Sequence, residues 1–246
     1  MITFERISKG FKGDIGAPRV QALRDVSFSV PSGEVFGFLG PNGAGKSTTI
    51  KILINLIRPD EGYAKILDLN VANSKVRKKV GFLPENPYFY DYLTARELLW
   101  FGGKAAGLDK QTIAQNSVEL LGQVGLERAV NRQLRTYSKG MVQRAGLALA
   151  LIHDPEVVIL DEPMSGLDPI GRKMVGDLII DLKNRGKTVF FSSHILNDVE
   201  RFCDRVAIIS DGCLRKIGPL KDLLSRGESL EDVFLREVKF ASETVQ

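Results

Sequence analysis

Short apolar runs recur along the chain, separated by longer stretches with helical spacing. Four runs are rich in β-branched or aromatic residues and bounded by polar turns, and they cover residues 35–39, 157–160, 188–192 and 206–209. This pattern predicts strands that are buried on both faces. The helical stretch 169–184 begins with proline and is followed by Gly186, as helix ends often are. Strands that alternate with helices predict an α/β fold with a mostly parallel sheet.

The ends and the middle of the chain add further elements. Residues 26–30 alternate apolar and polar side chains, which predicts a half-exposed strand. From Thr94 to about residue 153 the spacing is helical throughout, starting with a capping box that ends at Glu97, and this predicts a helical insert of about 60 residues. Asp211-Gly212 predicts a tight hairpin, and residues 229–232 predict the start of a short final helix.

A glycine-rich loop follows the first buried run and precedes a stretch with helical spacing, residues 49–56. Its sequence fits G-x-x-x-x-G-K-[ST]: Gly40-Pro41-Asn42-Gly43-Ala44-Gly45-Lys46-Ser47-Thr48. Backbone N–H groups of such a loop point at phosphate oxygens, and the helix start adds positive potential. We expect Lys46 to bridge the β- and γ-phosphates of a nucleotide and the Ser47 hydroxyl to bind Mg²⁺. A dinucleotide site fits less well, because the spacing is not G-x-G-x-x-G.

Further candidate residues stand where two other buried runs end. Asp161 and Glu162 follow one run, and His194 follows another. In open α/β sheets ligands bind at this edge. Asp161 therefore suits a carboxylate that binds Mg²⁺ directly or through the ion's other ligands, and Glu162 suits the group that orients or deprotonates water. His194 could donate a hydrogen bond to a γ-phosphate oxygen. The alternatives are a solvated acidic strand end and a structural histidine.

The overall composition is that of an ordinary globular protein. The chain has 246 residues, a formal charge of +4 and 43% hydrophobic residues. Its longest apolar stretch, residues 145–152, is far shorter than the roughly 20 residues that a membrane span needs. The start lacks the apolar run of a secretory signal, which favours the cytoplasm, and two cysteines favour reduced thiols over a disulfide framework. Basic residues form no tract, so nucleic acid is not an expected partner.

These motifs together resemble one family, the nucleotide-binding subunits of ATP-binding-cassette (ABC) transporters. Three further segments stand in the family's order: Gly81–Glu85 at the Q-loop, Tyr137–Met141 at the LSGGQ signature and Ser165–Asp168 at the D-loop. The resemblance covers residues 1–222. It implies a P-loop NTPase (RecA-like) fold with an N-terminal antiparallel β subdomain, a helical signature subdomain at approximately 87–153 and a C-terminal helical tail at 223–246.

The chain departs from the family pattern at two motifs. Glu85 replaces the Q-loop glutamine, and in the signature Lys139 and Met141 replace a glycine and a glutamine. Lys139 either adds a positive charge beside phosphate or extends into solvent, as long basic side chains usually do. The altered signature and the segment 230–235 resemble the subgroup that serves drug, lipid, polysaccharide or ion exporters.

The resemblance also implies a mechanism. Two cassettes, identical or paired, would hold each ATP between the Walker A loop of one and Ser138 and Gly140 of the other. Catalytic roles would fall on Glu162, His194, Lys46 and Asp168, metal binding on Ser47, Asp161 and Glu85, and adenine stacking on Phe11, for which a core role is the alternative. Hydrolysis would drive a separate membrane-spanning permease, and the subunit would be attached to the inner face of the membrane. Rival functions are a non-transport ABC ATPase acting on nucleic acid or in translation, and a P-loop kinase or GTPase.

Overall fold

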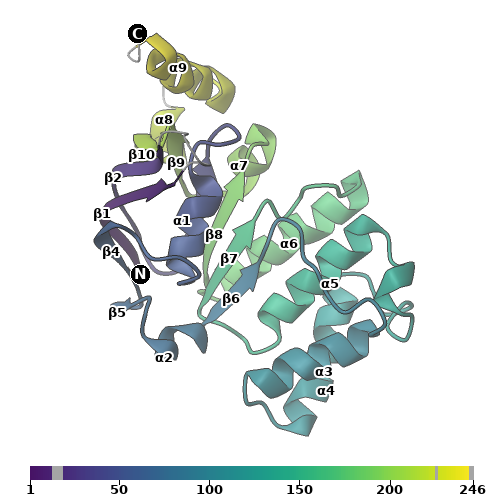
Figure 1. Ribbon diagram of the computed structural model, residues 1–246. Coiled ribbons are helices and arrows are strands. Elements are labelled where there is room, and N and C mark those ends of the chain that lie inside the picture. Colours follow the sequence, from purple (N-terminus) through teal and green to yellow (C-terminus); the bar gives the residue numbers. More distant parts are fainter. Residues whose placement is uncertain (13–18, 225–226, 244–246) are drawn as a thin grey trace.

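The computed structural model describes residues 1–12, 19–224 and 227–243, with side chains up to residue 238. Within this part of the chain the strands form two sheets (Figure 1). The first is antiparallel with the order β2-β1-β4-β5, and its strands are β1 (Ile2–Phe11), β2 (Val20–Val30), β4 (Glu61–Ile66) and β5 (Leu69–Asn70). The second has the order β10-β9-β3-β8-β7-β6, and its strands are β3 (Val35–Leu39), β6 (Val80–Leu83), β7 (Val157–Asp161), β8 (Thr188–Ser193), β9 (Arg205–Ser210) and β10 (Cys213–Pro219).

The second sheet confirms the predicted parallel arrangement. Strands β9, β3, β8, β7 and β6 run parallel, and β10 joins the edge antiparallel to β9. The four apolar runs form β3, β7, β8 and β9, and β3 and β7 are buried along their whole length. The alternating segment 26–30 is the end of β2, in the antiparallel sheet. Since the carboxyl ends of the parallel strands share one edge, the segments that follow β3, β7 and β8 come together there.

Helices lie between many of the strands, and two of the described ones follow the last strand. Their bounds are α1 (Lys46–Leu53), α2 (Ser74–Arg77), α3 (Ala95–Ala105), α4 (Lys110–Gln123), the 3₁₀ turn η1 (Leu134–Thr136), α5 (Lys139–Leu151), α6 (Pro169–Asn184), α7 (Leu196–Phe202), α8 (Leu220–Leu223) and α9 (Leu230–Glu243). Helix α6 occupies the predicted residues. Helix α1 begins and ends three residues earlier than the predicted stretch 49–56, because Lys46–Thr48 already form its first turn and Asn55 takes a left-handed backbone with φ 56°.

The helical insert is present but interrupted. Helix α3 starts with the predicted capping box, in which Thr94 and Glu97 bond each other's backbone N–H. Between α4 and α5, turns and η1 fill residues 124–138, although the apolar spacing there is helical. Gly125 there has φ 62°, and Arg144 of α5 donates a 2.6 Å hydrogen bond to the Val124 carbonyl. Apolar spacing continues through such turns because their side chains also enter the core.

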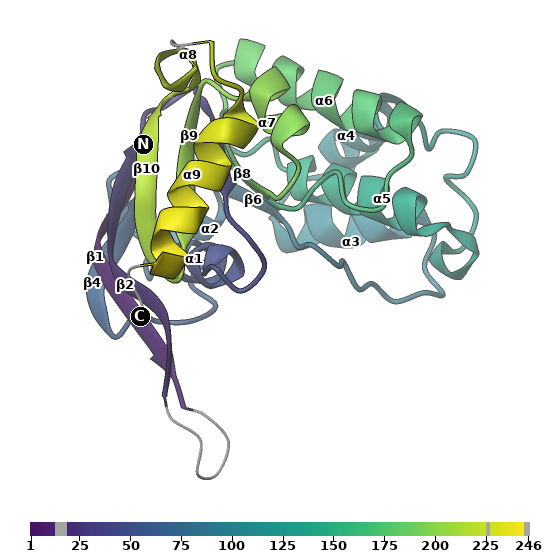
Figure 2. The same ribbon diagram turned by 90° about the horizontal axis from the view of Figure 1, so that it is seen from above.

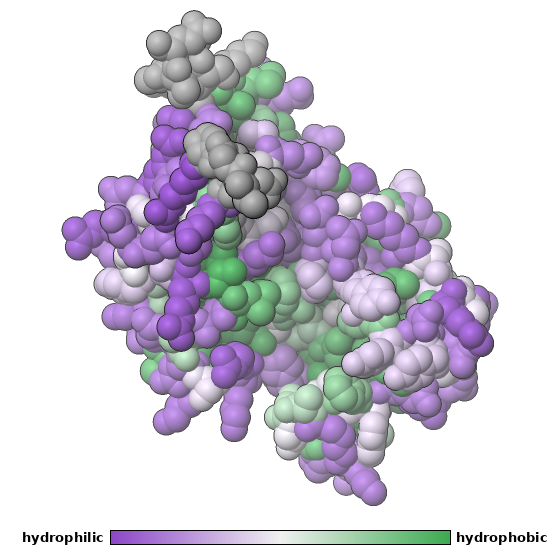
Figure 3. Space-filling model, viewed as in Figure 1, coloured by the Kyte–Doolittle hydropathy of each residue, from purple (hydrophilic) through white to green (hydrophobic). Residues whose placement is uncertain are grey.

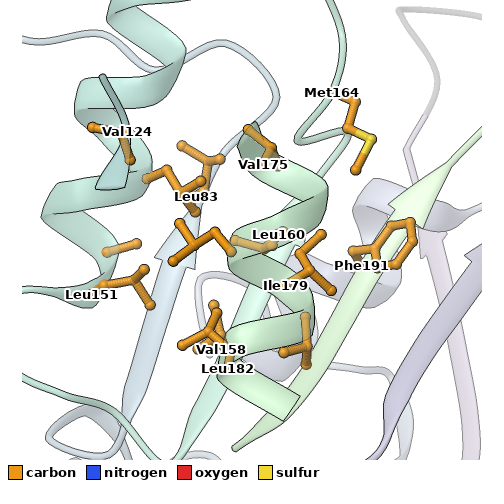
Figure 4. Packing of buried hydrophobic residues seen from close by; sticks show 14 of the residues in the cluster. Leu83, Val124, Leu151, Val158, Leu160, Met164, Val175, Ile179, Leu182 and Phe191 are labelled. Carbon is orange, nitrogen blue, oxygen red and sulfur yellow. The ribbon is translucent and has the colours of Figure 1, made fainter. Parts of the chain in front are cut away.

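Two apolar cores hold the layers together. One lies between the two sheets, where the rings of Phe4, Phe28, Phe36, Phe38 and Phe190 pack with centroid separations of 5.0–6.2 Å. The other joins the second sheet to the helices. In it Val158 and Leu160 of β7 face Val175 and Ile179 of α6 (Figure 4). The strand ends that carry the candidate site therefore rest on a closely packed support.

The C-terminal elements follow the predicted signals. Asp211 and Gly212, with φ 51° and 74°, turn β9 into β10. Ser229 and Asp232 bond each other's backbone N–H just before and within the first turn of α9, which lies along β9 and β10 (Figure 2). Residues 225–226 and 244–246 of the predicted tail lie outside the described residues. Among the described helices none combines the length and apolar character needed to cross a bilayer, and the face in Figure 3 is largely hydrophilic.

Candidate functional site

The loop between β3 and α1 wraps back on itself through left-handed glycines. Gly43 and Gly45 have φ 81° and 111°, values that favour glycine. A Cβ at Gly45 would also stand 2.7 Å from the Ala22 carbonyl oxygen, so the loop lies directly against β2. The loop then enters α1, and Thr49 Oγ1 donates a 3.0 Å bond to the Gly45 carbonyl. The result is a concave backbone that ends at a helix N-terminus, which is a binding site for anions.

Lys46 lies beneath this loop with its charge almost removed from water. Its side chain is 7% exposed, and Nζ donates to the carbonyls of Gly40 at 2.6 Å and Pro41 at 3.2 Å. The nearest acidic group is Glu162, whose Oε1 lies 3.8 Å from Nζ. A buried ammonium needs counter-charge, and one carboxylate at this distance supplies it only partly. The Lys46 ammonium can therefore bind a further negatively charged group.

Two carboxylates at the end of β7 are fixed by a serine of the neighbouring strand. Ser192 on β8 stands in register with Asp161, and its Oγ donates to Asp161 Oδ1 at 2.6 Å. The same Oγ accepts the backbone N–H of Glu162 at 3.0 Å. Glu162 has a left-handed backbone with φ 49°, which turns its side chain away from that of Asp161. Sequence reasoning missed Ser192, although a polar residue at the end of an apolar run was a visible signal.

His194 reaches the same point from the end of β8. Its Nδ1 lies 2.8 Å from Glu162 Oε2, while its side chain is 54% exposed. Glu162 is thus placed between Lys46 on one oxygen and His194 on the other. A carboxylate held in this way keeps a fixed orientation and accepts protons from a neighbouring donor.

One further acidic group lies close to the histidine. Asp198 is on α7, four residues beyond His194, and one of its carboxylate oxygens is buried without a hydrogen-bond partner among the described residues. Burial raises the pKa of Asp198, and the charges of Arg172, Arg201 and His194 act in the opposite direction. The surroundings of His194 therefore include negative as well as positive groups.

These groups open onto one cavity of about 370 Å³. Its lining residues come from the loop, from β2 and from the strand ends: Ala22, Pro41, Asn42, Gly43, Gly45, Lys46, Ser47, Thr48, Glu85, Glu162 and His194. The volume falls within the usual range of about 300–1,000 Å³ for small-molecule sites. The fold thus brings together the loop, Glu85, Glu162 and His194, which lie far apart in the sequence.

Side chains with oxygen atoms that suit a hard cation lie in and beside the cavity. Ser47 and Glu85 line it, whereas Asp161, which precedes Glu162, lies outside the lining with its Oδ1 held by Ser192. Carboxylate and hydroxyl oxygens are the ligands that Mg²⁺ prefers, so the donor set fits that ion.

Other predicted site residues lie outside the cavity lining. Gly40 and Ala44 form the base of the loop, where the Gly40 carbonyl binds Lys46 and Ala44 is buried. Ser138 and Asp168 cap helices: their side chains accept the N–H of Met141 at 3.3 Å and of Gly171 at 2.7 Å.

Gly140 and Phe11 also lie outside the cavity lining. Gly140 lies in the first turn of α5. The Phe11 ring on β1 is 42% exposed, with Lys9 Nζ 5.7 Å from its centroid. Within one chain, the Tyr137–Met141 segment is therefore separate from the cavity.

Comparison with known proteins identifies related chains. Residues 23–165 match the family model described as ABC transporter. An uncharacterized ABC transporter ATP-binding protein of Synechocystis is 49% identical over 87% of this chain and 61% of its own length. The bacitracin transport ATP-binding protein BcrA of Bacillus licheniformis is 42% identical over 84% of this chain and 67% of its own. The alignment with the Synechocystis protein thus spans about three fifths of that protein.

Solved structures share the fold. A structure described as the ATP-binding subunit of an ABC transporter aligns with a TM-score of 0.87 and 31% identity over 96% of this chain and 99% of the other. The dimeric post-hydrolysis state of the cassette MJ0796, bound to ADP and Pi, aligns with a TM-score of 0.81 and 28% identity over 89% of this chain and 99% of the other.

Proposed function

Because the chain belongs to the ABC transporter family of ATP-binding proteins, we propose that it binds and hydrolyses ATP as the ATP-binding subunit of a transporter. The observation that carries the proposal is the cavity in which Lys46, Glu162 and His194 meet beneath a phosphate-binding loop. A structural role alone would not require a buried lysine beside an incompletely neutralising carboxylate.

Nucleotide binding follows from the charges of the cavity. The N–H groups of the loop and the first turn of α1 donate hydrogen bonds to phosphate oxygens, and Lys46 supplies a positive charge to the β- and γ-phosphates. Ser47, Asp161 and Glu85 are the residues that would hold Mg²⁺, which supplies charge neutralisation at the phosphates when bound. Phe11 is proposed to stack on the adenine, since its ring is 42% exposed at the end of β1.

Hydrolysis is assigned to Glu162. Its carboxylate is held by His194 at 2.8 Å and lies in the cavity lining, where it orients and deprotonates an attacking water. His194, half-exposed at the same edge, donates to the γ-phosphate when it leaves Glu162. Asp168 in the D-loop is proposed to act in catalysis at the boundary with a second subunit.

The signature segment is proposed to act on a second cassette. Ser138 and Gly140 stand at the N-terminus of α5, outside the cavity of their own chain. Such a terminus attracts phosphate, and in a head-to-tail pair it would meet the γ-phosphate held by the other copy. The dimeric state of the MJ0796 cassette supports this arrangement. ATP then closes the pair, and cleavage removes the bridging phosphate.

The transported cargo would pass through a separate permease at the membrane, with this subunit attached at the inner face. BcrA, by its name, serves bacitracin transport, which supports a transport role for this chain, and the altered signature supports export. The partner determines the cargo, so no residue described above selects it.

The decisive experiment is the variant Glu162→Gln. The amide keeps the shape and the phosphate contacts but loses the proton acceptor, so ATP still binds while cleavage slows by about 10²–10⁴-fold. The stalled protein should elute as a dimer with ATP and Mg²⁺ but not with ADP. Normal hydrolysis by this variant would refute the catalytic assignment, whereas an inactive protein that stays monomeric would refute pairing without the permease.

A further inference from the structure

The signature segment packs directly on the D-loop of its own chain. A Cβ placed at Gly166 would lie 3.2 Å from both Cδ and Cε of Lys139, and one placed at Gly140 would lie 3.3 Å from Leu167 Cδ2. Gly166 has φ 70°, so its backbone presents an open surface to the lysine. The aliphatic stem of Lys139 therefore rests across the D-loop, and its direction is restricted although the residue is exposed.

The ammonium at the end of this stem has no counter-charge within the described residues. Lys139 forms no ion pair there, and the first turn of α5 contains no acidic side chain. Ser138 Oγ accepts a hydrogen bond from the N–H of Met141. The N–H groups of residues 139 and 140 lie in the first turn, where a helix provides no backbone acceptor. The positive end of the helix and the ammonium thus lie side by side.

We propose that Lys139 supplies a positive charge to the polyphosphate of ATP held by a second copy of this chain. The inference rests on the proposed head-to-tail pairing and concerns a residue that differs from the glycine of the family signature. Ser138 and Gly140 provide hydrogen bonds to the phosphate, and Lys139 adds charge that neither can provide. Packing against Gly166 holds the stem in place, which reduces the entropy lost when the ammonium meets the phosphate.

The test uses the slowly hydrolysing Glu162→Gln protein and compares single additional substitutions. Lys139→Met keeps an unbranched stem that can lie on Gly166 but removes the charge, and Lys139→Arg keeps both. Lys75→Met, on α2, is the matched control because it removes one charge from an exposed helix away from the signature. The dimer dissociation constant is measured by sedimentation with ATP and Mg²⁺, at low and at physiological ionic strength.

Lys139→Met is expected to weaken the ATP-dependent dimer by about tenfold at low ionic strength. A symmetric dimer contains two such contacts, and an exposed charge pair changes an equilibrium constant about threefold. Lys139→Arg should stay within about twofold of the parent, and the salt dependence should decrease in Lys139→Met. Each copy has a net charge of +4. If general repulsion between the copies decided the affinity, loss of one lysine charge would instead tighten the dimer in both methionine variants.

The outcomes separate the two proposals. A Lys139→Met dimer as tight as the parent overturns the role of Lys139 while leaving the pairing intact. An arginine variant as weak as the methionine variant also overturns it, because the effect would then follow the shape of the stem. Absence of any ATP-dependent dimer in the Glu162→Gln parent would refute pairing of the cassettes without the permease, and this inference with it.

Discussion

Replacing Ser192 with alanine tests whether the two carboxylates at the end of β7 depend on one hydroxyl. Ser192 is fully buried, and its Oγ serves both neighbours, donating to Asp161 at 2.6 Å and accepting from the Glu162 N–H at 3.0 Å. Alanine leaves the strand backbone and its packing unchanged. It therefore removes only these two hydrogen bonds.

The expected cost follows from the groups left behind. A buried N–H that loses its partner costs about 1–3 kcal/mol, and hydrogen bonds to charged groups contribute about 1.5–3 kcal/mol. The two losses share one hydroxyl and Asp161 lies next to the cavity, so we expect a total of about 2–4 kcal/mol. For a chain of this size that lowers the melting temperature by about 5–15 °C.

The assay is chemical unfolding together with the Mg²⁺ dependence of ATP hydrolysis. Asp161 freed from Ser192 can rotate, so the half-saturating Mg²⁺ concentration should rise in Ser192→Ala. Ser193→Ala is the control: its hydroxyl accepts from the Ile195 N–H at 3.0 Å, and it removes a buried hydroxyl of the same strand without touching Asp161 or Glu162. A loss below about 0.5 kcal/mol, or an equal change in Mg²⁺ dependence in both variants, would refute the reasoning.

Three other substitutions extend the test. Lys46→Ala should weaken ATP binding by about 10–100-fold, the value of a charge-assisted hydrogen bond, and calorimetric titration with unchanged affinity would contradict the role of the loop. Phe11→Ala should weaken nucleotide binding at least about fivefold if the ring stacks on the base, while a lower melting temperature at unchanged affinity would instead favour a core role. Asp60 accepts from Lys9 Nζ and Gly10 N–H and contacts Arg19, and the Lys9 and Gly10 hydrogen bonds lower its pKa from 3.8 to about 2. Because its folded pKa is depressed, the stability difference between the wild type and Asp60→Asn should be full above pH 3.8 and disappear as pH falls through about 2; a difference independent of pH in unfolding curves would exclude the ion cluster.

Local sequence signals predicted those helix ends that they mark directly. Proline and glycine bounded α6, and the capping box placed the start of α3, because both act within one helical turn. The start of α1 was missed because Lys46–Thr48 are polar, and periodicity detects a helix only where apolar residues mark its buried face. The turns between α4 and α5 were missed for the opposite reason, since their apolar residues enter the core without being helical.

Motifs in the sequence predicted most of the cavity, whereas the residues that the motifs omitted became visible only in the strand register of the structure. The loop residues and Glu162 follow from spacing, because each belongs to a strand end whose position the parallel sheet fixes. Ser192 acts through a pairing of β7 with β8 that joins residues 31 positions apart, and sequence periodicity contains no information on which strands are neighbours. The contact of Lys139 with Gly166 likewise depends on how α5 packs beside the D-loop.

Under the proposed function, the arrangement around Glu162 couples phosphate binding to catalysis. Lys46 Nζ is 3.8 Å from one oxygen of Glu162, and His194 Nδ1 is 2.8 Å from the other, so two nitrogen donors face the carboxylate. A γ-phosphate carries more negative charge than one carboxylate and would compete for the same two donors. In the proposed mechanism Lys46 and His194 turn to the phosphate, which leaves the oxygens of Glu162 free to accept a hydrogen bond from the attacking water. The event that fixes the substrate would then also free Glu162 for water, so that binding and activation are coupled through two side chains.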